Sequence, residues 1–105
     1  MIESAARTNL EEAALAVRHT SGLHARPAAL FVRAASRFSS EIQVENLTRR
    51  THPVDAKSIL SLLTLGVEKD HQIRITADGD DAAEAIGALQ RFIEADLAHD
   101  GEQPA

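Results

Sequence analysis

The stretch "SGLHARPAA", residues 21–29, combines residue types that can handle an anionic group by nucleophilic chemistry. His24 lies two positions before Arg26, and Pro27 follows directly. A neutral imidazole nitrogen is a competent nucleophile, and a guanidinium can bind two phosphoryl oxygens at once. We therefore interpret His24 as a candidate nucleophile and Arg26 as its anion-binding partner.

The residues that follow predict a helix that begins at this motif. Apolar residues recur at the three-and-four spacing of an amphipathic helix from Ala25 to about Phe38. The first N–H groups of a helix have no partner inside it and bind anions, and proline is tolerated in the first turn. A histidine near a helix start is nevertheless more often a cap or a surface residue, so spacing alone leaves both interpretations open.

The other elements follow from alternation and from capping residues. Alternating apolar residues predict strands in "ALAVRH", "EIQVE" and "QIRIT", and "RTHPV" reads as an edge strand because Pro53 lacks an N–H. Ser58 and Gly66 bound a short helix in "SILSLLTLG". Asp81 and Glu84 have the spacing of a capping box at the start of a last helix.

This element order predicts an α+β fold. We expect an open-faced sandwich in which three helices cover one side of a four-stranded antiparallel sheet, in the order β-α-β-β-α-β-α. A chain of 105 residues has room for one such domain. We expect a flexible N-terminal extension at residues 1–12, the domain at 13–98 and a C-terminal tail at 99–105.

Composition excludes several classes of protein. The net charge of −5 argues against nucleic-acid binding, yet residues 18–57 hold seven basic and three acidic side chains, which favours anions near the motif. No apolar run is long enough to span a membrane, and neither cysteines nor a secretion signal are found. We expect a cytoplasmic protein without membrane insertion.

Several segments together resemble one family. "GLHARPAALFV", "SEIQVE", "DAKSILSLLTLG" and "IRITADGDDAAEAI" are similar to HPr, the histidine-containing phosphocarrier of the bacterial phosphoenolpyruvate-dependent phosphotransferase system. The resemblance covers roughly residues 13–98. It implies that His24 accepts a phosphoryl group on Nδ1 from phosphorylated enzyme I and passes it to an enzyme IIA domain in sugar uptake, with Arg26 stabilising that group.

The resemblance also implies a carrier and not an enzyme with turnover of its own. No cofactor is expected, and we expect a monomer. In this family the surface beside the histidine contacts enzyme I and enzyme II. We assign to it Ala25, Pro27, Arg33, Lys57, Ile59, Leu60 and Leu63. Helical spacing alone leaves open whether the three apolar members belong to the core or to this surface.

Ser58 has two interpretations. As a preferred N-cap residue it could simply begin the short helix. The resemblance implies a regulatory site, because the serine of "AKSI" is phosphorylated by the ATP-dependent HPr kinase/phosphorylase in many members. A phosphate there would place about two negative charges beside the apolar residues and weaken docking.

Alternative functions remain open within the same chemistry. The chain could be a nitrogen-branch paralogue with different partners, or a purely regulatory module that uses Ser58 and the apolar surface. The other histidines, His19, His52, His71 and His99, lack metal-ligand spacing, and no metal site is expected.

Overall fold

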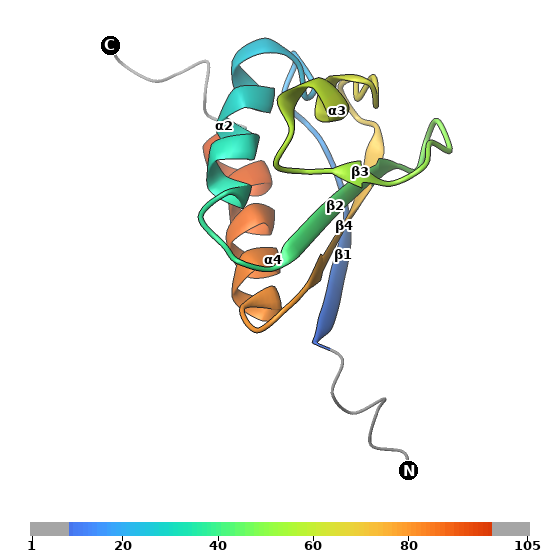
Figure 1. Ribbon diagram of the computed structural model, residues 1–105. Coiled ribbons are helices and arrows are strands. Elements are labelled where there is room, and N and C mark those ends of the chain that lie inside the picture. The colour runs from blue at the N-terminus through green and yellow to red at the C-terminus, as the bar shows by residue number, and fades with distance from the viewer. Residues whose placement is uncertain (1–8, 98–105) are drawn as a thin grey trace.

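The computed structural model describes residues 9–97, which form the expected α+β sandwich (Figure 1). A four-stranded antiparallel sheet carries three helices, which confirms the predicted fold class. In chain order the elements are β1 (Leu10–Ala16), α2 (Ala25–Ala35), β2 (Glu41–Asn46), β3 (Val54–Asp55), α3 (Ile59–Leu63), β4 (Gln72–Asp78), α4 (Ala82–Arg91) and the π-helical turn η1 (Phe92–Leu97).

The sheet has the strand order β1-β4-β2-β3, with β1 and β3 at its two edges. In the centre, Ile75 of β4 is paired with Ala13 of β1 on one side and with Val44 of β2 on the other. The strand predicted in "RTHPV" is reduced to Val54–Asp55; it lies at an edge of the sheet, as predicted, but Pro53 precedes it and is not part of it. β3 is only two residues long, and residues 47–53 connect it to β2.

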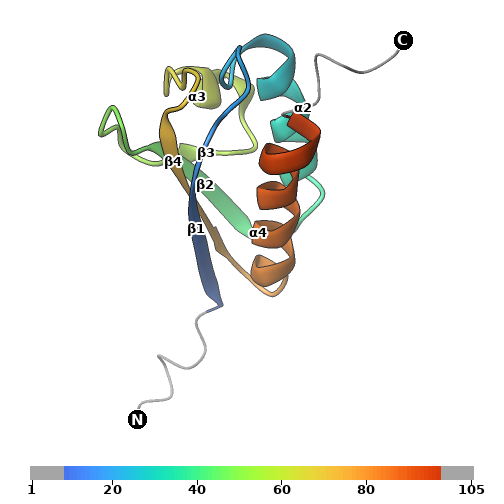
Figure 2. The same cartoon turned by 180° about the vertical axis from the view of Figure 1, so that it is seen from behind.

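The core lies between one face of the sheet and the helices. Along β2 and β4 every second side chain is buried, including Ile42, Val44 and Ile73. α2 and α4 contact each other on this face, and Figure 2 shows them side by side. Phe31 of α2 meets Phe92 edge to face, with ring centroids 6.0 Å apart. These contacts hold α2 against the C-terminal helical segment over the sheet.

Several boundaries differ from the prediction. β1 begins at Leu10, so Leu10, Glu11 and Glu12 belong to the strand and pair with β4. α2 ends at Ala35 and not near Phe38, with the Ser36 N–H donating to Val32 O. Residues 1–8 of the expected extension and the expected tail at 99–105 lie outside the described residues.

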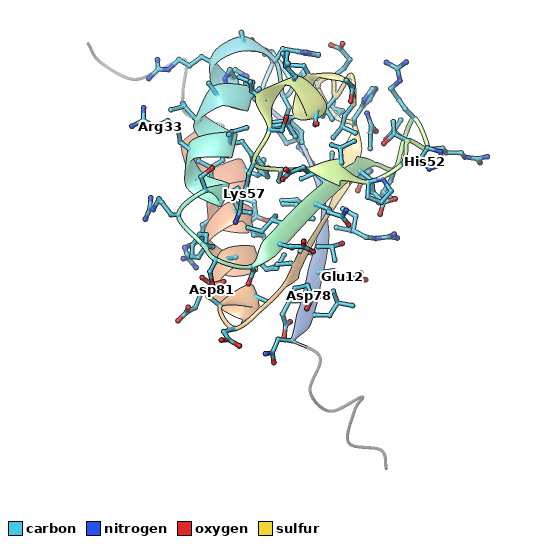
Figure 3. All side chains as sticks on the ribbon, viewed as in Figure 1. Glu12, Arg33, His52, Lys57, Asp78 and Asp81 are labelled. Carbon is cyan, nitrogen blue, oxygen red and sulfur yellow. The ribbon has the colours of Figure 1, made fainter. Side chains whose placement is uncertain are left out.

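The predicted capping box at α4 is wrong. Asp81 is the N-cap residue, but its side chain makes no capping bond and turns to the loop before β2. There its carboxylate accepts hydrogen bonds from the backbone N–H groups of Ser39, at 2.8 Å, and Ser40, at 2.9 Å, and from the Ser40 hydroxyl. The Ser40 hydroxyl and the Ser39 N–H lower the pKa of Asp81 to about 2. Asp81 therefore ties the start of α4 to the end of the α2–β2 connection (Figure 3).

Candidate functional site

The segment before the histidine is held closely against the loop that precedes β4. Gly22 has φ +61°, and a Cβ at this position would lie 2.0 Å from the carbonyl oxygen of Val67. The N–H of Leu23 donates to that same oxygen at 3.0 Å, and the Leu23 side chain is fully buried. Glycine is required here because the backbone is left-handed and the approach leaves no space for a side chain.

His24 is the N-cap residue of α2, as the sequence predicts. Its backbone is extended, with φ −125° and ψ 163°, and its side chain makes no capping hydrogen bond. The imidazole is 36% exposed, so it is not buried among aliphatic side chains. The ring therefore lies at the positive end of the helix dipole and remains accessible to a reaction partner.

The first residue of α2 has an unusual backbone. Ala25 has φ +50°, in the left-handed region that costs a residue with a Cβ about 1–2 kcal/mol. The regular helical geometry therefore begins after Ala25. Arg26 is already part of the helix, although its position before Pro27 biases it away from helical angles.

A carboxylate lies within hydrogen-bond distance of the imidazole. Nε2 of His24 lies 3.2 Å from Oε2 of Glu68, which is in the loop between α3 and β4. Sequence reasoning missed Glu68, because 44 residues separate it from His24 and no motif spacing marks it. The adjacent Leu23–Val67 hydrogen bond brings the two segments together.

The polar and small residues assigned to the site differ in exposure. Ala25 and Arg26 are exposed in the first turn of α2. Arg33, which is labelled in Figure 3, is exposed near the end of the helix. Pro27 is buried, so its exposure gives no support for the expected place on a contact surface. Arg26 lies two residues after His24, in the first turn of α2.

The apolar residues of α3 are on the surface. Leu60 is 75% exposed, and Ile59 and Leu63 are exposed to a smaller extent, while Leu62 is buried. This exposure excludes the core interpretation that helical spacing left open for these three residues. α3 packs against α2, and both views place α3 at the same end of the molecule as the start of α2 (Figures 1 and 2). We refer to Ile59, Leu60 and Leu63 as the α3 patch.

Ser58 and Lys57 lie directly before this helix. Ser58 is the N-cap of α3, and its hydroxyl accepts a hydrogen bond from the Ser61 N–H at 3.2 Å, which confirms the capping role. Lys57 donates through Nζ to the carbonyl oxygen of Phe38 at 2.6 Å. Its ammonium group therefore joins α3 to the α2–β2 connection.

Two other described histidines lie at other positions in the fold. His52 lies on the β2–β3 connection, far from the start of α2 (Figure 3). Nδ1 of His71 is 3.1 Å from both the Asn46 side-chain amide and the Glu68 N–H. Within residues 9–97 no group of three histidine, aspartate or glutamate side chains could hold a metal ion, and no helix there is long and apolar enough to cross a membrane.

Comparisons with known proteins agree with this geometry. The family described as "PTS HPr component phosphorylation site" matches residues 11–95. The multiphosphoryl transfer protein of Haemophilus influenzae is 43% identical over 77 residues, which are 73% of this chain and 15% of that protein. The chain therefore spans a small part of that relative's length.

Solved structures extend the similarity to the whole fold. HPr-C-His from Thermoanaerobacter tengcongensis is 44% identical, with a TM-score of 0.79 over 90% of this chain and 99% of that one. An HPr dimer from the same organism is 46% identical, with a TM-score of 0.65 over 79% of this chain and 92% of that one. HPr proteins are phosphocarriers and not enzymes. The match over residues 11–95 and the identity of the fold show that this chain belongs to the HPr family of the phosphotransferase system.

Proposed function

We propose that this chain accepts a phosphoryl group on Nδ1 of His24 from phosphorylated enzyme I and donates it to an enzyme IIA domain in the cytoplasm. The observation that carries this proposal is the accessible imidazole at the N-terminus of α2. The helix dipole there favours an anion, and Arg26 supplies a cation in the same turn. The family match supports the proposal independently.

The α3 patch supports the docking half of the proposal. Leu60 is a large apolar side chain that is three-quarters exposed, which is a feature of contact surfaces. α3 packs against the helix that His24 begins, so a partner seated on the patch would lie close to the imidazole. Arg33 is exposed on the outer side of α2, where a charged rim would favour an acidic partner.

Phosphorylation of His24 is tested by mass spectrometry. Incubation with phosphoenolpyruvate and enzyme I is expected to add the mass of one phosphoryl group, in a linkage that acid hydrolyses. The His24→Ala variant should show no gain, whereas His52→Ala, which removes an exposed histidine elsewhere, should be modified like the wild type. An unmodified wild-type chain, or a modified His24→Ala variant, would contradict the proposal.

We propose Ser58 as a regulatory site on the basis of its position. Ser58 is a half-buried residue, and it directly precedes the exposed Ile59. Phosphate at this N-cap would sit favourably at the start of α3 and would add about two negative charges beside the α3 patch. HPr kinase and ATP are expected to give an acid-stable phosphate in the wild type and none in Ser58→Ala. If this were the main modification and His24 stayed unmodified, the chain would be a regulatory module.

The chain is proposed to act as a monomer, because the α3 patch and the start of α2 are both available on one copy. Sedimentation with and without enzyme I tests this. A nitrogen-branch role would use the same His24 chemistry with other partners. Measuring phosphoryl transfer to purified enzyme IIA domains of the sugar branch and of the nitrogen branch distinguishes the two roles.

A further inference from the structure

The contact between His24 and Glu68 favours a proton on one particular ring nitrogen. An ionised carboxylate only accepts hydrogen bonds, so the 3.2 Å contact requires Nε2 of His24 to donate. In a neutral ring with a proton on Nε2, the lone pair is on Nδ1. Glu68 therefore favours the tautomer in which Nδ1 is the nucleophile.

The backbone of Glu68 is held in place on both sides. Its N–H donates to Nδ1 of His71 at 3.1 Å, and its carbonyl oxygen accepts from the His71 N–H at 3.0 Å. His71 is in turn bonded to Asn46, which is fully buried at the end of β2. The preceding Val67 carbonyl is bonded to Leu23, one residue before His24. The carboxylate thus extends from an ordered turn that is fixed relative to the imidazole.

We propose that Glu68 is a positioning residue for His24, which selects the Nε2–H tautomer and stabilises the ring charge during transfer. The second part rests on the proposed phosphocarrier function. Nδ1 forms a bond to phosphorus while the bond from phosphorus to the donor atom of enzyme I breaks, and the donor atom keeps that electron pair. No proton leaves His24, so its ring gains positive charge, which the carboxylate on Nε2 offsets.

The same contact assists the onward step. When the phosphoryl group leaves Nδ1 for an acceptor, the ring departs with the electron pair of the P–N bond. A ring that still carries its Nε2 proton leaves as a neutral imidazole, and Glu68 holds that proton in place. Glu68 is thus expected to accelerate acceptance and, during donation, to retain the proton that lets the ring leave as a neutral imidazole.

The size of the effect is limited by solvent. The side chains of His24 and Glu68 are 36% and 61% exposed, so water and salt screen their interaction. Loss of the carboxylate is expected to slow phosphoryl transfer about fivefold at low salt, which corresponds to about 1 kcal/mol. The difference between variant and wild type should shrink as salt is added.

The test compares Glu68→Ala with a matched control, Asp70→Asn. Asp70 is in the same turn and its side chain is equally exposed at 61%, but its carboxylate faces Lys69 and Arg18 and not His24. Asparagine also tolerates the left-handed backbone of residue 70, which has φ +71°. The two variants therefore remove the same charge from the same turn.

Two measurements are made on each protein. The ¹⁵N shifts of the His24 ring, recorded above the pH at which imidazole titrates, report the tautomer population without any phosphorylation. Rapid-quench measurements give the rate of transfer from enzyme I. The wild type and Asp70→Asn are expected to show a larger Nε2–H share than a short histidine peptide, and Glu68→Ala is expected to match the peptide and to transfer more slowly.

The outcomes separate the two proposals. If Glu68→Ala has the wild-type tautomer population, or transfers at the wild-type rate at low salt, the role of Glu68 is refuted while the phosphocarrier function stands. If Asp70→Asn changes both readouts as much as Glu68→Ala, the effect is one of general charge and the positioning role is again refuted. A wild-type chain that enzyme I does not phosphorylate overturns the proposed function and the transfer role together, and the ring shifts still decide the tautomer.

Discussion

Replacement of Gly22 by alanine tests how tightly the site depends on one backbone contact. The new Cβ would lie 2.0 Å from the Val67 carbonyl oxygen, and the residue has φ +61°. The left-handed backbone costs an alanine about 1–2 kcal/mol. Relief of the overlap requires backbone movement, which adds roughly 1–3 kcal/mol. Gly22→Ala is therefore expected to lower the free energy of unfolding by roughly 2–5 kcal/mol, a large part of the usual stability of a domain.

The assay is urea denaturation followed by circular dichroism, with Gly87→Ala as the matched control. Gly87 is inside α4, and a Cβ there would meet only the flexible end of Arg91, at 3.4 Å. The same substitution should stabilise the protein by up to about 1 kcal/mol, because alanine is the better helix former. Opposite signs for the two variants are expected. A Gly22→Ala variant as stable as the wild type would refute the steric reasoning.

Three further predictions follow from residues outside this contact. Ala25→Gly should raise the free energy of unfolding by roughly 0.5–1 kcal/mol, since relief of the left-handed strain exceeds the entropy cost of glycine; a lower denaturation midpoint would contradict it. The Asp81 carboxylate has a depressed pKa, so its stabilisation is present above pH 3.8 and is lost as the pH falls through about 2. Asp81→Asn should therefore melt at a lower temperature than the wild type at neutral pH, and the difference in melting temperature should disappear in acid. A difference that stays constant with pH would show that the ionised carboxylate is not its cause. Leu60→Ser should change stability by less than about 0.5 kcal/mol but raise the KM for enzyme I, whereas Leu62→Ala should cost about 2–5 kcal/mol, because only Leu62 is buried. An unchanged KM for Leu60→Ser would remove the α3 patch from docking.

Local residue patterns along the sequence were sufficient to predict most of the strands and helices. The alternation around Ile73 and Ile75 predicted β4, because one face of that strand is buried and the other is not. Ser58 predicted the start of α3 because its hydroxyl satisfies an N–H of the first turn. Asp81 was assigned to a cap on the same logic, but the Ser39 and Ser40 donors lie about 40 residues away and compete successfully for its carboxylate. Such competition depends on tertiary structure and leaves no local pattern.

The candidate site likewise contains residues that the local sequence predicted and others that it did not. His24 and Arg26 were visible because both belong to one helix start, where residue type and spacing carry the chemistry. Glu68 could not be found from spacing, since the fold alone brings its loop to the imidazole. Exposure of Leu60 was also undecidable, because a five-residue helix is too short for its periodicity to define a buried face.

The placement of β1 at the rim of the sheet has a consequence for solubility. Among residues 9–97, β1 pairs with β4 alone, so its outer row of amide and carbonyl groups is open to another extended chain. Glu11 and Glu12 are both exposed along this rim. Their negative charges would meet each other if two copies aligned rim to rim, and this repulsion guards a long exposed strand against self-association.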